Sequence, residues 1–113
     1  MNKLFNVIFI TALVFSACSK KPVVELPITT SSPKALEYYK KAMLSAQVGD
    51  DFEKRQHLDS ALFLDPGFVM ALDRYESLDP IKKREQREMA KSLQNTVTEA
   101  EQLILKIRNA YRD

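Results

Sequence analysis

The chain contains one cysteine, Cys18, and one histidine, His57, and these two side chains could do the most specific chemistry. A thiol can act as a nucleophile, a metal ligand or an acylation site, and an imidazole can act as a base or a metal ligand. No serine stands in a nucleophile-elbow pattern, and no glycine-rich phosphate loop or His/Cys zinc spacing is present. Acidic residues surround His57 in the sequence, at Asp50, Asp51, Glu53 and Asp59. We expect them to be surface residues, and we expect no enzyme, no cofactor and no metal site.

The residues before Cys18 have the composition of a secretory signal. Lys3 gives a positive start, residues 4–15 are almost entirely apolar, and Ser16 and Ala17 are small. A charged segment, a short apolar run and a small-residue cleavage site are typical of a signal peptide. A transmembrane anchor is an alternative, although a span needs about 20 apolar residues. A buried structural cysteine is a second alternative.

Phe15, Ser16, Ala17 and Cys18 resemble the lipobox of bacterial lipoproteins, in which a bulky apolar residue and two small residues precede the lipidated cysteine. The resemblance implies cleavage after Ala17, attachment of a diacylglycerol to the Cys18 thiol and acylation of the new amino group. Two or more acyl chains anchor a protein stably to a membrane. Ser19 stands where an aspartate would resemble an inner-membrane retention signal. We therefore expect a lipid-anchored protein of the bacterial cell envelope, at the outer membrane.

The composition favours one small all-α domain. The formal net charge is +2 at pH 7, and removal of a signal containing Lys3 would lower it by one. So balanced a charge gives no overall field to attract nucleic acid, and we expect no nucleic-acid partner. A single cysteine allows no intrachain disulfide. Two glycines, no tryptophan and many Lys, Glu, Leu and Ala residues favour helices over a sheet.

The chain divides into three parts. We expect a signal peptide at residues 1–17, the lipidated cysteine with a flexible tether at residues 18–32, and a small all-α domain at residues 33–113. The tether is predicted from its two prolines and its polar run of threonines and serines. Fully extended, it would reach at most about 45 Å from Cys18. The domain would then stay close to the bilayer surface.

Capping and breaking residues divide residues 33–78 into a helical hairpin and a short third helix. Pro33 suits the first position of a helix. Gly49 can end that helix in the left-handed conformation. Asp50 can cap the second helix, and the sequence Asp-Pro-Gly at residues 65–67 is a strong break. The third helix would follow directly.

Residues 35–68 resemble a tetratricopeptide repeat, which is a 34-residue helix–turn–helix unit. Small Ala61 stands where the two helices of the repeat approach closely, and Pro66 stands where its second helix ends. Gly49 is at the turn, and aromatic Tyr38 occupies the large-residue position near the start. The resemblance implies tetratricopeptide-like packing of two antiparallel helices. A generic helical hairpin is the alternative.

Residues 80–111 are expected to form one long helix, because no proline or glycine follows residue 80. At 1.5 Å per residue it would be roughly 48 Å long, about twice the length of either hairpin helix. Two arrangements remain open. The helix could continue beyond the hairpin and present its remaining apolar stripe to a partner, or it could break near residues 92–96 and close a bundle. The stripe comprises Met89, Leu93, Val97, Ala100, Leu103, Ile104, Ile107 and Tyr111.

The expected function is protein binding. The candidate partner surface consists of Leu103, Ile107 and Tyr111 on the C-terminal helix, with Tyr38 and Lys41 on the concave side of the first hairpin helix. We expect a non-catalytic accessory or scaffold subunit that holds a protein partner at the envelope. The alternative is a structural lipoprotein that forms homo-oligomers through its C-terminal helix.

Overall fold

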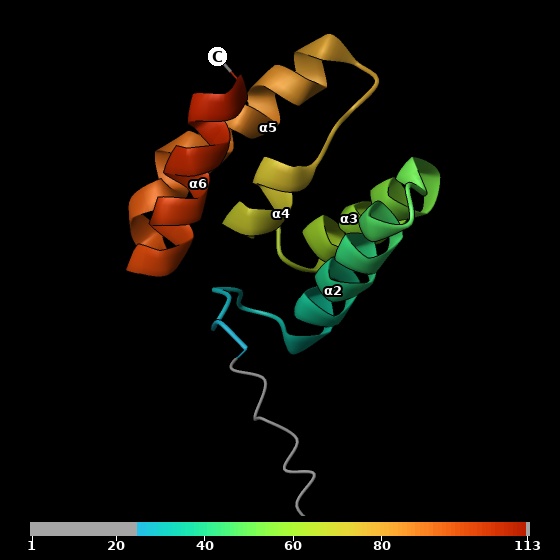
Figure 1. Ribbon diagram of the computed structural model, residues 1–113, viewed down its shortest axis with the longest axis horizontal. Coiled ribbons are helices and arrows are strands. Elements are labelled where there is room, and N and C mark those ends of the chain that lie inside the picture. Colours follow the sequence, from blue (N-terminus) through green and yellow to red (C-terminus); the bar gives the residue numbers. More distant parts are fainter. Residues whose placement is uncertain (1–24, 113) are drawn as a thin grey trace, which may run out of the picture.

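The computed structural model describes residues 25–112, and all regular structure in this range is helical, which confirms the all-α class (Figure 1). The helices in chain order are α2 (Pro33–Gln47), α3 (Asp51–Leu64), α4 (Val69–Arg74), α5 (Pro80–Leu93), the 3-10 turn η1 (Gln94–Thr96) and α6 (Glu99–Arg112). The signal segment, the lipobox residues and Cys18 lie outside the described residues.

The expected helical hairpin is formed by α2 and α3. The hydroxyl of Ser32 accepts a hydrogen bond from the amide of Ala35 at 3.1 Å, which caps the start of α2. Gly49 adopts a φ of +78° in the turn, a left-handed conformation that glycine reaches without steric cost. The carboxylate of Asp50 then caps α3 by accepting from the amide of Glu53 at 2.9 Å. These local signals position the hairpin as the sequence predicts.

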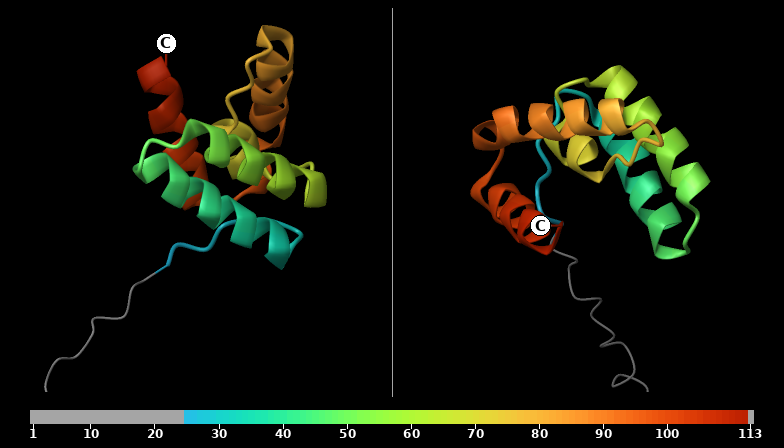
Figure 2. Two further views of the ribbon diagram at one scale, coloured as in Figure 1. Left: turned by 90° about the vertical axis from the view of Figure 1, so that its right-hand side faces the viewer. Right: turned by 90° about the horizontal axis from the view of Figure 1, so that it is seen from above.

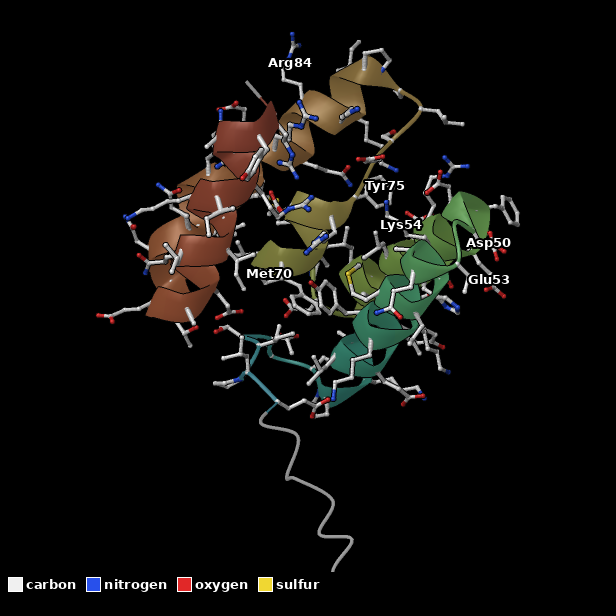
Figure 3. The ribbon with its side chains drawn as sticks, viewed as in Figure 1. Asp50, Glu53, Lys54, Met70, Tyr75 and Arg84 are labelled. Atoms are coloured by element: carbon white, nitrogen blue, oxygen red, sulfur yellow. The ribbon has the colours of Figure 1, made fainter. Side chains whose placement is uncertain are left out.

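The short helix α4 lies at the centre of the core. Its residues from Val69 to Asp73 are all buried, and the ring of Phe68 just before it packs 5.1 Å from the ring of Tyr39 on α2. Figures 1 and 2 show α4 between the hairpin on one side and the helices α5 and α6 on the other, and Met70 is labelled there in Figure 3. The two halves of the fold therefore meet at α4.

The single long helix expected over residues 80–111 is wrong, and the alternative with a break near residues 92–96 is correct. α5 ends at Leu93, and α6 begins anew after Thr98. The amide of Thr98 donates to Glu101 at 2.9 Å, and the amide of Glu101 donates to the Thr98 hydroxyl at 3.3 Å. This reciprocal capping box stabilises a new helix start, and the intervening asparagine, threonines and valine are weak helix formers.

The flexible tether expected over residues 18–32 does not extend to residue 32. We call residues 25–32 the strap. The amide and hydroxyl of Thr29 donate to Glu101 at 2.8 and 2.7 Å. The hydroxyl of Thr30 and the amide of Ser31 donate to Asp65 at 2.6 and 2.9 Å. The strap thus links the start of α6 to the end of α3, because two carboxylates far away in the sequence accept its hydrogen bonds.

Glu101 and Asp65 are both buried, yet the pKa of each is lowered. Burial alone would raise these pKa values, because it disfavours a charged carboxylate. Hydrogen bonds from Thr29 and Thr98 to Glu101, and from Thr30, Ser31 and Gly67 to Asp65, outweigh that effect. A lowered pKa in the folded state means that ionisation of the group stabilises the fold.

The Glu101→Gln variant tests the hydrogen bonds that Glu101 accepts from Thr29 and Thr98. Its side-chain amide would turn a donor toward the donors of Thr29 or Thr98, so we expect the free energy of unfolding to fall by about 1–3 kcal/mol at neutral pH. Folding lowers the pKa of Glu101, so ionised Glu101 stabilises the folded state at pH values above its ordinary pKa. This stabilisation is lost as the pH falls through the pKa of Glu101 in the folded state. Urea denaturation of both proteins should therefore give a difference that narrows on acidification below about pH 4.5.

The matched control is Glu99→Gln, since Glu99 is exposed on the same helix turn. It should leave the free energy of unfolding within about 0.5 kcal/mol of the parent. An effect of Glu101→Gln on the free energy of unfolding that is the same at every pH would contradict a stabilising role for ionised Glu101.

Candidate interaction surface

The inner side of α6 is fixed by an ion-pair cluster around the buried carboxylate of Asp73. The carboxylate of Asp73 on α4 pairs with the Nε of Arg108 and, at 2.9 Å, with the Nη1 of Arg112. The Nη2 of Arg112 also donates to the main-chain carbonyl of Asp73 at 2.8 Å. Leu105 is buried on the same side of the helix. These contacts fix the rotation of α6 about its axis, and hence the side that it turns to solvent.

The outer face of α6 carries the three residues that the sequence analysis singled out. Leu103, Ile107 and Tyr111 follow one another at intervals of four, with 59, 49 and 89% of their surfaces exposed. Residues four apart on a helix lie on the same side, so the three form one continuous apolar stripe. We call this stripe the α6 face. Because the ion pairs with Asp73 hold the opposite side of α6 against the core, the α6 face points to solvent.

Tyr38 and Lys41 lie elsewhere, on α2, where other residues of the hairpin contact them. The ring of Tyr38 is 6.2 Å from that of His57 on α3. The Nζ atoms of Lys34 and Lys41 each lie 5.5 Å from the centre of the Tyr38 ring, at the range of cation–π contacts. Lys41 also pairs with Glu37 at 3.2 Å. The Tyr38 ring is half-buried, so it offers only part of its surface to a partner.

The structure does not bring the two sets of residues into one surface. In Figure 1, α2 and α6 lie on opposite sides of α4. Next to Tyr38 there is a separate shallow groove of about 500 Å³ between α2 and α3, with exposed Phe63 at its wall. A partner that covers the α6 face would therefore bind at a different place from one that covers Tyr38 and Lys41.

Sequence reasoning missed the polar residues that position the α6 face. Asp73 has no local signal, because its partners Arg108 and Arg112 lie 35 and 39 residues further along the chain. Glu101 did have one, because a threonine three residues before a glutamate is the pattern of a capping box.

A polar groove of about 270 Å³ lies beside the Asp73 cluster, between α4, α5 and α6. Its lining includes the cationic side chains of Arg87, Lys91 and Arg112 together with Asp73. Within residues 25–112 no group of three or more His, Cys, Asp or Glu side chains is arranged to hold a metal ion. No helix in the same range is both long enough and apolar enough to cross a bilayer.

Comparison with known proteins identifies no relative. No family model matches the chain, and neither the curated proteins nor the solved structures include a similar one.

Two neighbouring leucines of α6 provide a direct test of its orientation. Leu103→Gln removes an exposed apolar side chain and should change the free energy of unfolding by no more than about 0.5 kcal/mol. Leu105→Ala removes a buried one and should cost about 2–5 kcal/mol. Thermal or urea denaturation measures both. Equal losses for the two variants would show that α6 is rotated differently.

Proposed function

We propose that this chain is a lipid-anchored lipoprotein of the bacterial cell envelope, at the outer membrane, and that it acts as a non-catalytic accessory or scaffold subunit. It binds a protein partner through the α6 face. The observation that carries the proposal is the exposure of Leu103, Ile107 and Tyr111 on a helix whose opposite side is fixed by Asp73. Contiguous exposed apolar side chains on a small domain are typical of an interaction surface.

The α6 face has the properties of a preformed binding surface. Its backbone is helical, and the ion pairs of Arg108 and Arg112 with Asp73 hold it before any partner arrives. A surface that is already ordered loses little conformational entropy on binding. Tyr111 adds an aromatic side chain, of the kind enriched among the residues that contribute most to binding energy. A helical groove or an apolar helix on the partner would complement this face.

Self-association through α6 is the second candidate. Ala100, Leu103, Ile107 and Ala110 have the alternating spacings of three and four that coiled coils use. However, α6 has only 14 residues, which is two heptads, whereas coiled coils usually sustain three or four. Because the chain breaks after Leu93, the apolar residues Met89 and Leu93 lie on α5 and cannot extend this repeat on α6. A different protein is therefore the better-supported partner.

The lipid anchor supports the same role. Cys18 and the lipobox residues Phe15, Ser16 and Ala17 imply an acylated amino terminus. A domain held at a membrane meets membrane-bound partners at high effective concentration, so a modest apolar face can suffice for binding. This gives a helical domain without catalytic chemistry a use at the envelope.

Site-specific photo-crosslinking in cells tests the partner surface. A crosslinker is placed at Tyr111, which is 89% exposed, and in the control at Phe63 on α3, which is 86% exposed. We expect adducts with a different protein from position 111 only, and we expect Leu103→Gln in the same chain to weaken them. A ladder at multiples of the protein's own mass would support self-association instead. Identical patterns from both positions would contradict the proposal.

Mass spectrometry of the protein from membranes tests the anchor. The parent chain should begin at Cys18 and carry acyl groups, and it should sediment with membranes. Cys18→Ser removes the sulfur that the diacylglycerol needs, so this variant should carry no lipid, whereas Ser19→Ala should still be acylated. A parent protein without acyl groups would contradict the proposed lipoprotein.

A further inference from the structure

An apolar groove of about 640 Å³ runs between the strap and α2. Leucine, isoleucine and methionine side chains contribute most of its lining: Leu26, Ile28, Leu36, Met43 and Leu44. It is larger than the groove beside Tyr38 and the groove beside Asp73.

The apolar surface continues from the groove along the outward side of α2. Lys40, Leu44 and Val48 follow at intervals of four, and the two apolar side chains are 62 and 81% exposed. Lys40 pairs with Glu25 of the strap at 2.8 Å. The aliphatic part of a lysine can lie against apolar surroundings while its charge reaches a polar layer. We call this surface, from Leu26 across α2 to Val48, the strap–α2 face.

The strap–α2 face begins at one end of the molecule and follows α2. In Figure 1 the strap and the start of α2 form the lower end, from which α2 rises toward the turn before α3, and the start of α5 and the end of α6 form the upper end. Arg84 on α5 is labelled at that upper end in Figure 3. α6 starts beside the strap, at the Thr29–Glu101 hydrogen bonds, and leads away from this end.

The chain leaves the strap–α2 face toward Cys18. Six residues lie between Cys18 and Glu25, so even a fully extended chain spans at most about 25 Å between them. Hydrogen bonds to Glu101 and Asp65 fix the other end of the strap at residues 29–31. Lys20 and Lys21 lie within this short connection, and their charges suit the anionic lipids of a bilayer surface.

We propose that the strap–α2 face rests on the lipid bilayer, with Leu26, Leu44 and Val48 at headgroup depth. The inference depends on the proposed lipidation of Cys18. An acyl anchor within about 25 Å of Glu25 brings this end of the domain to the bilayer. The apolar side chains then leave water, and the lysines reach the phosphates. The domain acquires a fixed orientation, in which the α6 face stays clear of the lipid and open to a protein partner.

Spin labels on the full-length, lipidated protein test this orientation. The protein is reconstituted in vesicles of phosphatidylethanolamine and phosphatidylglycerol. Single cysteines replace Val48 or, as the control, Arg84, which is exposed on α5 and labelled at the upper end in Figure 3. Acylation blocks Cys18, so the label attaches only at the new position. The measured quantity is the ratio of accessibility to oxygen, which concentrates in lipid, over accessibility to a water-soluble nickel chelate.

We expect a several-fold higher ratio at position 48 than at position 84. Adding Leu44→Glu to the position-48 protein should lower its ratio toward that of position 84 without loss of the acyl groups. Equal, water-like ratios at both positions in an acylated protein would overturn the docking while leaving the anchor intact. An immobilised label at position 48 with a water-like ratio would also overturn it, because it would indicate contact with protein. Absence of acyl groups on Cys18 would refute the anchor and this inference together.

Discussion

Three buried carboxylates, Asp65, Asp73 and Glu101, join segments of this fold that are far apart in the sequence. A carboxylate removed from water is costly unless donors surround it. Here the donors come from other elements: the strap for Asp65, α6 for Asp73, and the strap with the α6 cap for Glu101. Each acid is therefore compatible with burial only when its partner segment is in place. Strap, α4 and α6 are thus coupled to one another.

The local part of the fold could be predicted from the sequence. Caps and turns depend on neighbouring residues, so Pro33, Gly49 and Asp50 gave the hairpin its boundaries. The break before α6 also has a local signal, the capping box of Thr98 and Glu101, although the absence of proline and glycine favours one continuous helix. The threonines and serines of the strap are typical of a flexible linker. The carboxylates that accept their hydrogen bonds lie far away in the sequence, so no local pattern indicates that the strap is bound.

The candidate surface was partly predictable for a similar reason. Helical periodicity places Leu103, Ile107 and Tyr111 on one side of a helix whether or not that helix continues from α5. Which side faces the solvent depends on Asp73, whose partners lie more than thirty residues away. No local pattern reports such a pairing. Tyr38 contacts Lys34 and Lys41 at local helical spacings on α2, whereas its contact with His57 on α3 has no local signal.

The coupling of the strap has a consequence for function. A freely moving tether would let the domain take any orientation within reach of the anchor, whereas a strap bonded to both halves of the fold shortens that reach. We propose a lipid-facing surface at the strap and α2, and a protein-binding surface along α6. Both depend on the same hydrogen bonds, because Glu101 holds the strap and also begins α6.

Hydrogen exchange of individual amides in the full-length protein measures this coupling most directly. Thr29 and Ser31 donate their amide protons to Glu101 and Asp65. The account predicts that these two amides exchange much more slowly than those of an unstructured peptide, and that Glu101→Gln accelerates exchange at Thr29. Exchange of both amides at the unstructured rate in the parent protein would contradict a docked strap.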